Sequence, residues 1–298
     1  MGLFGRSSRK TGVGSRMAGA AWQAAKNEVL PGQGRGRPAQ KAGGSGQRTA
    51  NSRRGAGSYQ RPAPEPEPDV GEIIARPTRR GRPSEYEPKK LEHYHPTFAA
   101  SAVGVAGLGL FDSSFGEGQV HRGRLGELDF YKVLCKTDLI DAYRSFWSVP
   151  LPEATMPIRA DQKYTTDVDC ILLRGNTIHL IDLKYYTSGA VTWHSSGETW
   201  LLCRDDATGK QVGKPRKMSR NMDMAVQRFR SLFPHADVRA CVTLIPTNFG
   251  ESSVTPGTCW PGGIPLRTLT QTLEDLRAAG EETPDPAIDR ALLTLMGE

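Results

Sequence analysis

The clearest feature in the pattern of apolar and polar residues is a pair of short apolar runs near the middle of the chain. Residues 168–173 and 178–183 are almost continuously apolar, and Arg174-Gly175-Asn176 between them supplies turn-forming residues. Continuous rather than alternating hydrophobicity is typical of strands that are covered on both faces. We therefore predict a hairpin of two central strands in this part of the chain.

Other apolar patterns predict the elements around this hairpin. Apolar residues at helical spacing indicate helices, and short β-branched or aromatic runs indicate strands. Trp193 and Trp200 are expected to be cross-strand partners in a second hairpin, with stacking on an unpaired base as the functional alternative. The predicted elements are helices over 126–147, 218–233, 266–279 and 286–296, a hairpin over 191–203 and a strand over 238–245.

This order of elements predicts an α/β fold, in which a mixed central sheet is flanked by helices. The N-terminal part differs, because residues 31–90 are rich in Gly, Pro, Arg and Ser and cannot build a core. The expected organisation is a long disordered basic tail over 1–97, an apolar linker over 98–119, the main domain over 120–280 and a C-terminal helix over 281–298.

Cysteine usage and hydropathy indicate a cytoplasmic location. The five cysteines are scattered without Cys-x-x-Cys spacing, which is typical of free thiols in a reducing compartment. The N-terminus lacks the apolar core of a signal peptide. The apolar run 98–111 is shorter than the roughly twenty residues that span a bilayer, so membrane contact is only a minor alternative.

Charge is divided unevenly between the tail and the domain. Residues 1–95 hold 18 Lys and Arg against 8 Asp and Glu, whereas the remaining residues hold 21 against 24. A basic tail on a near-neutral domain favours a polyanionic partner such as nucleic acid, with a merely solubilising tail as the alternative.

Two groups of basic residues are candidates for binding nucleic acid. The tail contains two Arg-Gly-Arg-Pro tetrads that resemble the core of AT-hook peptides, whose arginines lie in narrow A·T minor grooves. A polar loop in the domain is placed to meet phosphates. The candidate residues are Arg35, Arg37, Arg80 and Arg82 in the tetrads and Lys214, Arg216 and Lys217 in the loop.

Three charged residues interrupt the apolar hairpin. Asp182 and Lys184 are two positions apart and point to the same side of their strand, and an antiparallel neighbour can bring Asp169 beside them. Such charges are costly to bury unless they are compensated. Mg²⁺ prefers hard oxygen ligands and would compensate two carboxylates. A surface ion pair between Asp182 and Lys184 is the structural alternative.

The order of these motifs resembles a known family. Gly126-Glu127 is followed by Asp167-Val168-Asp169, then by Asp182-Leu183-Lys184, and then by Gly189 and the tryptophan hairpin. Over roughly residues 120–280 this is similar to the nuclease-related domain (NERD) family of the PD-(D/E)xK nuclease superfamily. Asp182 stands where that family more often has Glu. The resemblance implies a restriction-endonuclease-like core.

The resemblance also implies a reaction. We expect Mg²⁺- or Mn²⁺-dependent hydrolysis of phosphodiester bonds, with DNA as the expected substrate. Asp169 and Asp182 would hold the metal, Lys184 would act on the attacking water, and Glu127 would be an auxiliary ligand or an N-terminal capping carboxylate. Two alternatives stay open, namely an RNA nuclease and a non-catalytic nucleic-acid-binding or scaffold protein with a nuclease-like domain.

Overall fold

The computed structural model describes residues 63–78, 99, 101–107, 117–152, 167–280 and 282–297. All of them belong to one compact unit, Pro62–Glu298. The predicted tail lies largely outside the described residues, and so do the four tetrad arginines, Arg35, Arg37, Arg80 and Arg82. The described part contains no helix that is long and apolar enough to cross a membrane.

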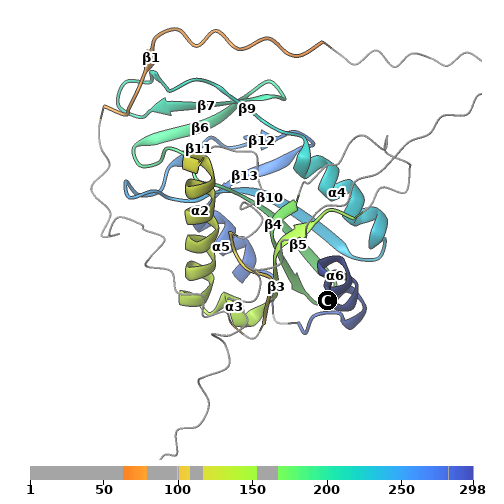
Figure 1. Cartoon of the computed structure of the whole chain (residues 1–298). Coiled ribbons are helices and arrows are strands. Elements are labelled where there is room, and N and C mark those ends of the chain that lie inside the picture. The colour runs from red at the N-terminus through yellow and green to blue at the C-terminus, as the bar shows by residue number, and fades with distance from the viewer. Residues whose placement is uncertain are drawn as a thin grey trace, which may run out of the picture. The chain divides into compact units, whose positions relative to one another are not determined.

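A seven-stranded mixed sheet forms the centre of this unit (Figure 1). The predicted central hairpin is confirmed, because its two strands are the fourth and fifth in the order and have neighbours on both sides. The order is β12 (Cys259–Trp260), β13 (Ile264–Thr268), β10 (Asp237–Leu244), β5 (Thr177–Lys184), β4 (Asp167–Arg174), β3 (Arg144–Pro150) and β2 (Ala102–Val103).

Strand direction explains the mixed character of the sheet. β4 and β5 are antiparallel and are joined at Gly175, whose φ of 52° suits the tight turn. β10 runs parallel to β5 from the pair Asp237–Thr177 to the pair Leu244–Lys184. The predicted strand over 238–245 therefore covers the side of the hairpin that β4 leaves open.

Helices pack on both faces of the central sheet. One apolar cluster joins a sheet face to α2 (Glu117–Lys136), α3 (Leu139–Ala142) and α5 (Leu269–Arg277). The other cluster joins the opposite face to α4 (Asn221–Leu232) and α6 (Pro286–Met296). α6 has the predicted bounds, with Asp285 as its N-cap and Pro286 in its first turn.

A second sheet contributes to the same apolar cluster as α4 and α6. Its order is β1 (Ile73–Ile74), β8 (Gln211–Val212), β7 (Trp200–Asp205), β6 (Val191–Ser196) and β11 (Ser253–Val254), and β9 (Arg216–Lys217) also pairs with β7.

The second hairpin is confirmed, but the pairing of its tryptophans is wrong. Trp193 lies opposite Cys203, and Trp200 lies opposite Ser196. The three-residue turn between the strands sets this register. Trp200 pairs with Ser196, which is three residues away from Trp193 along β6, so the two rings lie on opposite faces of the hairpin. Trp193 is buried in the core, whereas Trp200 is partly exposed.

The predicted helix over 126–147 is wrong at both ends. α2 begins at Glu117 and ends at Lys136, where Asp138 adopts a left-handed conformation with φ of 58°. Residues 144–150 form β3 instead, because they pair antiparallel with β4 and bury Phe146 and Trp147 completely. The apolar spacing resembled a helix, and only pairing with a distant strand decided otherwise.

The predicted helix over 266–279 also begins too early. Residues up to Thr268 belong to β13, which pairs parallel with β10 and buries Ile264 and Leu266. Thr268 then starts α5 with a capping box, since its side chain accepts from Gln271 N and the Gln271 side chain accepts from Thr268 N.

Candidate functional site

The central hairpin places Asp169 and Asp182 at its open end. The last ladder pair at this end joins Cys170 to Ile181, so the next position sets Asp169 across from Asp182. Asp169 Oδ2 accepts a hydrogen bond from Leu183 N at 2.6 Å, which fixes this carboxylate to the neighbouring strand.

Lys184 forms an ion pair with Asp182 on the same side of β5. Its Nζ lies 2.6 Å from Asp182 Oδ2, and the two side chains are 23% and 17% exposed. Burial alone would lower the pKa of Lys184, but the negative charges of Asp182 and Asp169 outweigh it and raise that pKa. Lys184 is therefore a firmly held cation.

Glu127 reaches the same place from α2. The neighbouring Gly126 permits a close approach, because a Cβ at that position would lie 3.1 Å from the Cβ of Tyr185, the residue that follows β5. Glu127 is 4% exposed, and its Oε2 accepts from Gly107 N at 2.6 Å. It lies in the interior of α2, so the alternative of an N-terminal capping carboxylate is wrong.

Burial and neighbouring negative charge raise the pKa values of Asp169 and Glu127. Burial raises the pKa of Asp169 to about 7, with Asp182 as the next cause. Burial, followed by the charge of Asp169, raises the pKa of Glu127 well above its usual value. Desolvation and a nearby like charge both disfavour the ionised form. Such strongly perturbed groups beside a cavity are typical of functional sites.

Sequence reasoning missed two residues at this site. Asp167 precedes Asp169 by two positions on β4, and its pKa is raised by burial and then by the charge of Asp182. Its signal was the Asp-Val-Asp spacing, which puts both carboxylates on one side of a strand. Ser148 in β3 has a φ of 54° at the position opposite Asp169, where the β3–β4 register skips a pair. No sequence pattern announces such a backbone conformation.

A cavity of about 980 Å³ opens beside these groups. Glu127, Asp169 and Lys184 line it together with basic and aromatic side chains. Arg216 is one of them, and its guanidinium lies 4.2 Å from the ring centroid of Tyr186. The other two predicted loop residues, Lys214 and Lys217, are not among the lining residues.

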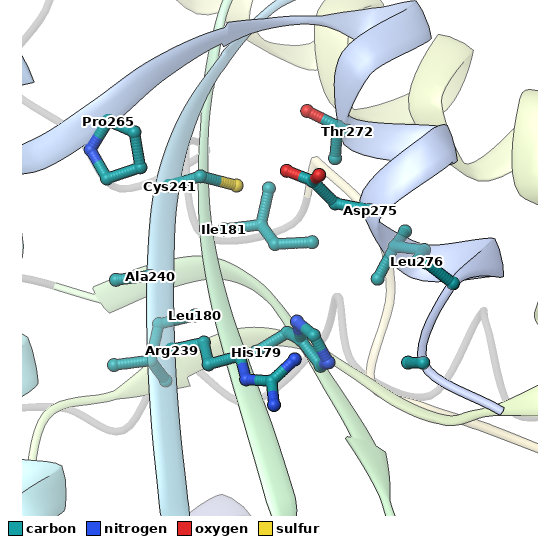
Figure 2. A pocket seen from close by; sticks show the side chains of 12 residues that line it. His179, Leu180, Ile181, Arg239, Ala240, Cys241, Pro265, Thr272, Asp275 and Leu276 are labelled. Atoms are coloured by element: carbon teal, nitrogen blue, oxygen red, sulfur yellow. The ribbon is translucent and has the colours of Figure 1, made fainter. Parts of the chain in front are cut away.

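A second cavity of about 360 Å³ lies between β5, β10 and α5 (Figure 2). Figure 2 shows His179, Asp275 and Cys241 around it. His179 is an odd number of residues away from both Asp182 and Lys184 along β5, so its side chain lies on the opposite face of the sheet. Burial lowers the pKa of His179 to about 4 and raises the pKa of Cys241 to about 11, which leaves a neutral imidazole and a protonated thiol. These groups lack the clustered carboxylates of the larger cavity.

The oxygen atoms offered by the side chains at the larger cavity are of the chemical type that a hard divalent cation binds. Asp169, Asp182 and Glu127 offer carboxylate oxygens, and their crowded negative charge is the kind that a cation relieves. Among the described residues, however, no three His, Cys, Asp or Glu side chains are grouped closely enough to hold a metal ion in this arrangement. Asp182 is engaged by Lys184 instead, so cation binding requires that its side chain turn away from the ammonium.

The family comparison agrees with the motif order. Residues 122–245 match the model of the nuclease-related domain family, and the match runs from within α2 to just past the end of β10. Searches of curated proteins and of solved structures gave no significant match. The matched segment contains Glu127, Asp169, Asp182 and Lys184. This segment of the chain therefore matches the nuclease-related domain family, and we call residues 122–245 the nuclease-related domain.

Proposed function

We propose that this protein is a divalent-metal-dependent nuclease that hydrolyses phosphodiester bonds of DNA. The observation that carries the proposal is the cluster of Asp169, Asp182, Glu127 and Lys184 beside an arginine-lined cavity in a nuclease-related domain. Carboxylates and a lysine on adjacent strands, with positive charge around them, suit a reaction at a phosphate. The topology of the central sheet is also compatible with the proposed restriction-endonuclease-like core.

Each residue has a defined task in this proposal. Asp169 and Asp182 hold Mg²⁺ or Mn²⁺, and Glu127 is the auxiliary ligand. The bound ion supplies Lewis-acid chemistry at the phosphate and lowers the pKa of a water. Lys184 would donate hydrogen bonds to the attacking water and to the developing negative charge. Arg216 holds a substrate phosphate, and its guanidinium is fixed in place by the Tyr186 ring.

The direct test is a cleavage assay on the full chain. Plasmid, linear duplex, single-stranded DNA and RNA are incubated with Mg²⁺ or Mn²⁺ and with EDTA. We expect metal-dependent cleavage of DNA that Asp169→Asn abolishes. Asp275→Asn is the matched control, because it makes the same change at the other cavity. Cleavage that persists in Asp169→Asn, or that EDTA does not stop, would contradict the proposed site.

The same assay separates the two alternative functions. Cleavage of RNA with intact DNA would make the protein an RNA nuclease. Binding of nucleic acid without cleavage of any substrate, at any metal concentration, would favour a non-catalytic binding or scaffold protein. We further propose that the basic tail attaches the protein to DNA by its charge and by the tetrad arginines Arg35, Arg37, Arg80 and Arg82.

A further inference from the structure

A short segment that precedes the nuclease-related domain is bound to the second sheet. We call residues 72–78 the strap. Its strand β1 pairs parallel with β8, with Ile73 opposite Gln211 and Ile74 opposite Val212. Gly213 N donates to Ile74 O at 2.8 Å, which continues the pairing. At the start of the strap, Glu72 Oε2 lies 2.8 Å from Lys210 Nζ.

The far end of the strap is anchored on a buried carboxylate. Thr78 N and Thr78 Oγ1 each donate to the side chain of Asp205 at 2.7 Å. Asp205 is 1% exposed and also accepts from Thr208 N and Thr208 Oγ1. Burial would raise the pKa of Asp205, but the bonds from Thr208 and Thr78 lower it. An ionised buried carboxylate needs these donors, so loss of Thr78 would leave it partly unsatisfied.

The strap forms one wall of the cavity that holds the carboxylate cluster. Residues 75–78 line this cavity together with Glu127 and Asp169. Arg76 is the basic residue of the strap and is exposed. The tail segment and the nuclease-related domain therefore meet at the candidate active site.

Three arginines from three separate elements surround the cavity. Arg76 comes from the strap, Arg122 from α2 and Arg216 from β9, and all three line it. Within the described ranges none of these guanidinium groups forms an ion pair with a carboxylate. They are thus available to an external anion, and a guanidinium fork suits two phosphate oxygens.

We propose that the strap completes a phosphate-binding subsite, in which Arg76 binds the backbone of a nucleic-acid strand whose scissile phosphate lies at Asp169 and Lys184. This inference rests on the proposed nuclease function and names where its substrate lies. The negative charges of the carboxylates repel a free anion from the base of the cavity. A nucleic-acid strand carries several phosphates, so one phosphate could lie at a metal ion there while a neighbouring phosphate binds Arg76. Thr78 and Asp205 position Arg76 by fixing the strap.

The test measures binding separately from cleavage. Fluorescent single-stranded DNA is titrated with the full chain in EDTA, and the Kd is followed against salt concentration. We expect Arg76→Ala to weaken binding about three- to tenfold and to reduce the salt slope by about 0.7, the contribution of one phosphate contact on a single strand. Arg76→Lys should recover part of the affinity. Arg204→Ala is the control, because it removes an exposed arginine of the same sheet that does not line the cavity.

A second variant tests the anchor. Thr78→Val removes one donor to Asp205 with little change of shape, and we expect it to weaken binding as Arg76→Ala does. Hydrogen exchange over residues 72–78 should become faster in this variant. Because Arg76 is exposed, Arg76→Ala leaves folding intact and decides the question even if Thr78→Val does not fold.

Three results would overturn the subsite. The first is an equal Kd for Arg76→Ala and Arg204→Ala. The second is tighter binding or faster cleavage in Thr78→Val, which would mean that the strap obstructs the cavity. Failure of the nuclease proposal looks different, because binding would still depend on Arg76 while no metal supports cleavage. The third result, metal-dependent cleavage that is unchanged in Arg76→Ala, would retain the nuclease and remove the subsite.

Discussion

Lys184 Nζ lies 2.6 Å from Asp182 Oδ2, so the proposed catalytic cation and a proposed metal ligand neutralise each other in this structure. The two roles are therefore coupled. If Asp182 held a divalent cation as proposed, its contact with Lys184 would be lost and the ammonium would be free to face a substrate. Metal binding and release of Lys184 from its ion pair would then occur together.

This coupling predicts different results for the two partners. Asp182→Asn removes a negative charge that the cation needs, so Mn²⁺ affinity and cleavage should both collapse. Lys184→Ala should retain Mn²⁺ binding or tighten it, because Asp182 no longer has a competing partner, and should still lose cleavage. Calorimetric titration of Mn²⁺ and thermal unfolding with and without metal measure the affinity and the folding of both variants.

The opposite result would have a clear meaning. If both Asp182→Ala and Lys184→Ala unfold the domain and added Mn²⁺ restores neither, the pair is structural. The nuclease assignment should then be withdrawn in favour of a metal-free scaffold.

The raised pKa of Asp169 predicts how stability depends on pH. In the folded chain this pKa is raised from 3.8 to about 7, so between these values the native state holds a proton that the unfolded chain has released. Its contribution to stability therefore decreases as pH rises toward 7 and levels off above it. His179 has the opposite sign, because its pKa is lowered from 6.5 to about 4.

A comparison with Asp169→Asn isolates the first contribution, since His179 is common to both proteins. Without metal, the variant should gain stability relative to the parent as pH rises from about 4 to about 7. Urea unfolding at several pH values measures this difference. In the parent, Mn²⁺ affinity should also increase with pH over the same range, because the cation binds the ionised carboxylate. A difference in stability that does not change with pH would show that Asp169 is already ionised.

Gly126 predicts a steric test of how α2 is placed. A side chain at Gly126 meets Tyr185, whereas nothing lies within 4 Å of a Cβ built at Gly118 in the same helix. Gly126→Val should reduce the free energy of unfolding by about 1–3 kcal/mol through overpacking and should displace Glu127. Gly118→Val should change it by less than about 0.5 kcal/mol. Chemical denaturation and cleavage rates report both effects, and equal behaviour of the two variants would mean that α2 tolerates a shift.

The arginine tetrads of the tail predict a preference for A·T-rich duplex. Replacing Arg35, Arg37, Arg80 and Arg82 by Lys keeps the charge, but Lys is more strongly hydrated and enters narrow grooves less readily. Affinity for A·T-rich duplex should fall while affinity for G·C-rich duplex stays nearly constant. Competition binding with the two duplexes measures this ratio. An unmodified protein that binds both equally would end the minor-groove hypothesis.

Deletion of the tail should be made in two steps. Removal of residues 1–62 should flatten the salt dependence of DNA binding if the tail attaches by charge, since each phosphate contact contributes about −0.9 to the slope on duplex DNA. Removal of residues 1–78 also takes away the strap and should reduce affinity further. An unchanged slope after the first deletion would rule out this part of the tail as the anchor.

Sequence by itself determined the central hairpin and the charged residues that it carries. Two short apolar runs joined by a turn that contains glycine fit few structures other than a β-hairpin. Asp182 and Lys184 are two residues apart, so their side chains lie on the same side of any strand. The bounds of α6 were equally local, because a proline and an N-cap aspartate mark its start. The order of motifs was sufficient to indicate the nuclease-related domain.

Tertiary structure decided what depends on partners far away in the chain. Trp147 could satisfy a helical pattern, and only the exposed edge of β4 made its segment a strand. Glu127 was found by its motif, but its place inside α2 follows from the start of that helix at Glu117, and Gly126 leaves room for Tyr185 beside the helix. The strap had no sequence signal, because a two-residue strand has no period and its anchor on Asp205 joins residues 127 positions apart. A local sequence pattern does not report the free energy of pairing between segments that are far apart in the chain. Such pairing positions the segments that line this cavity.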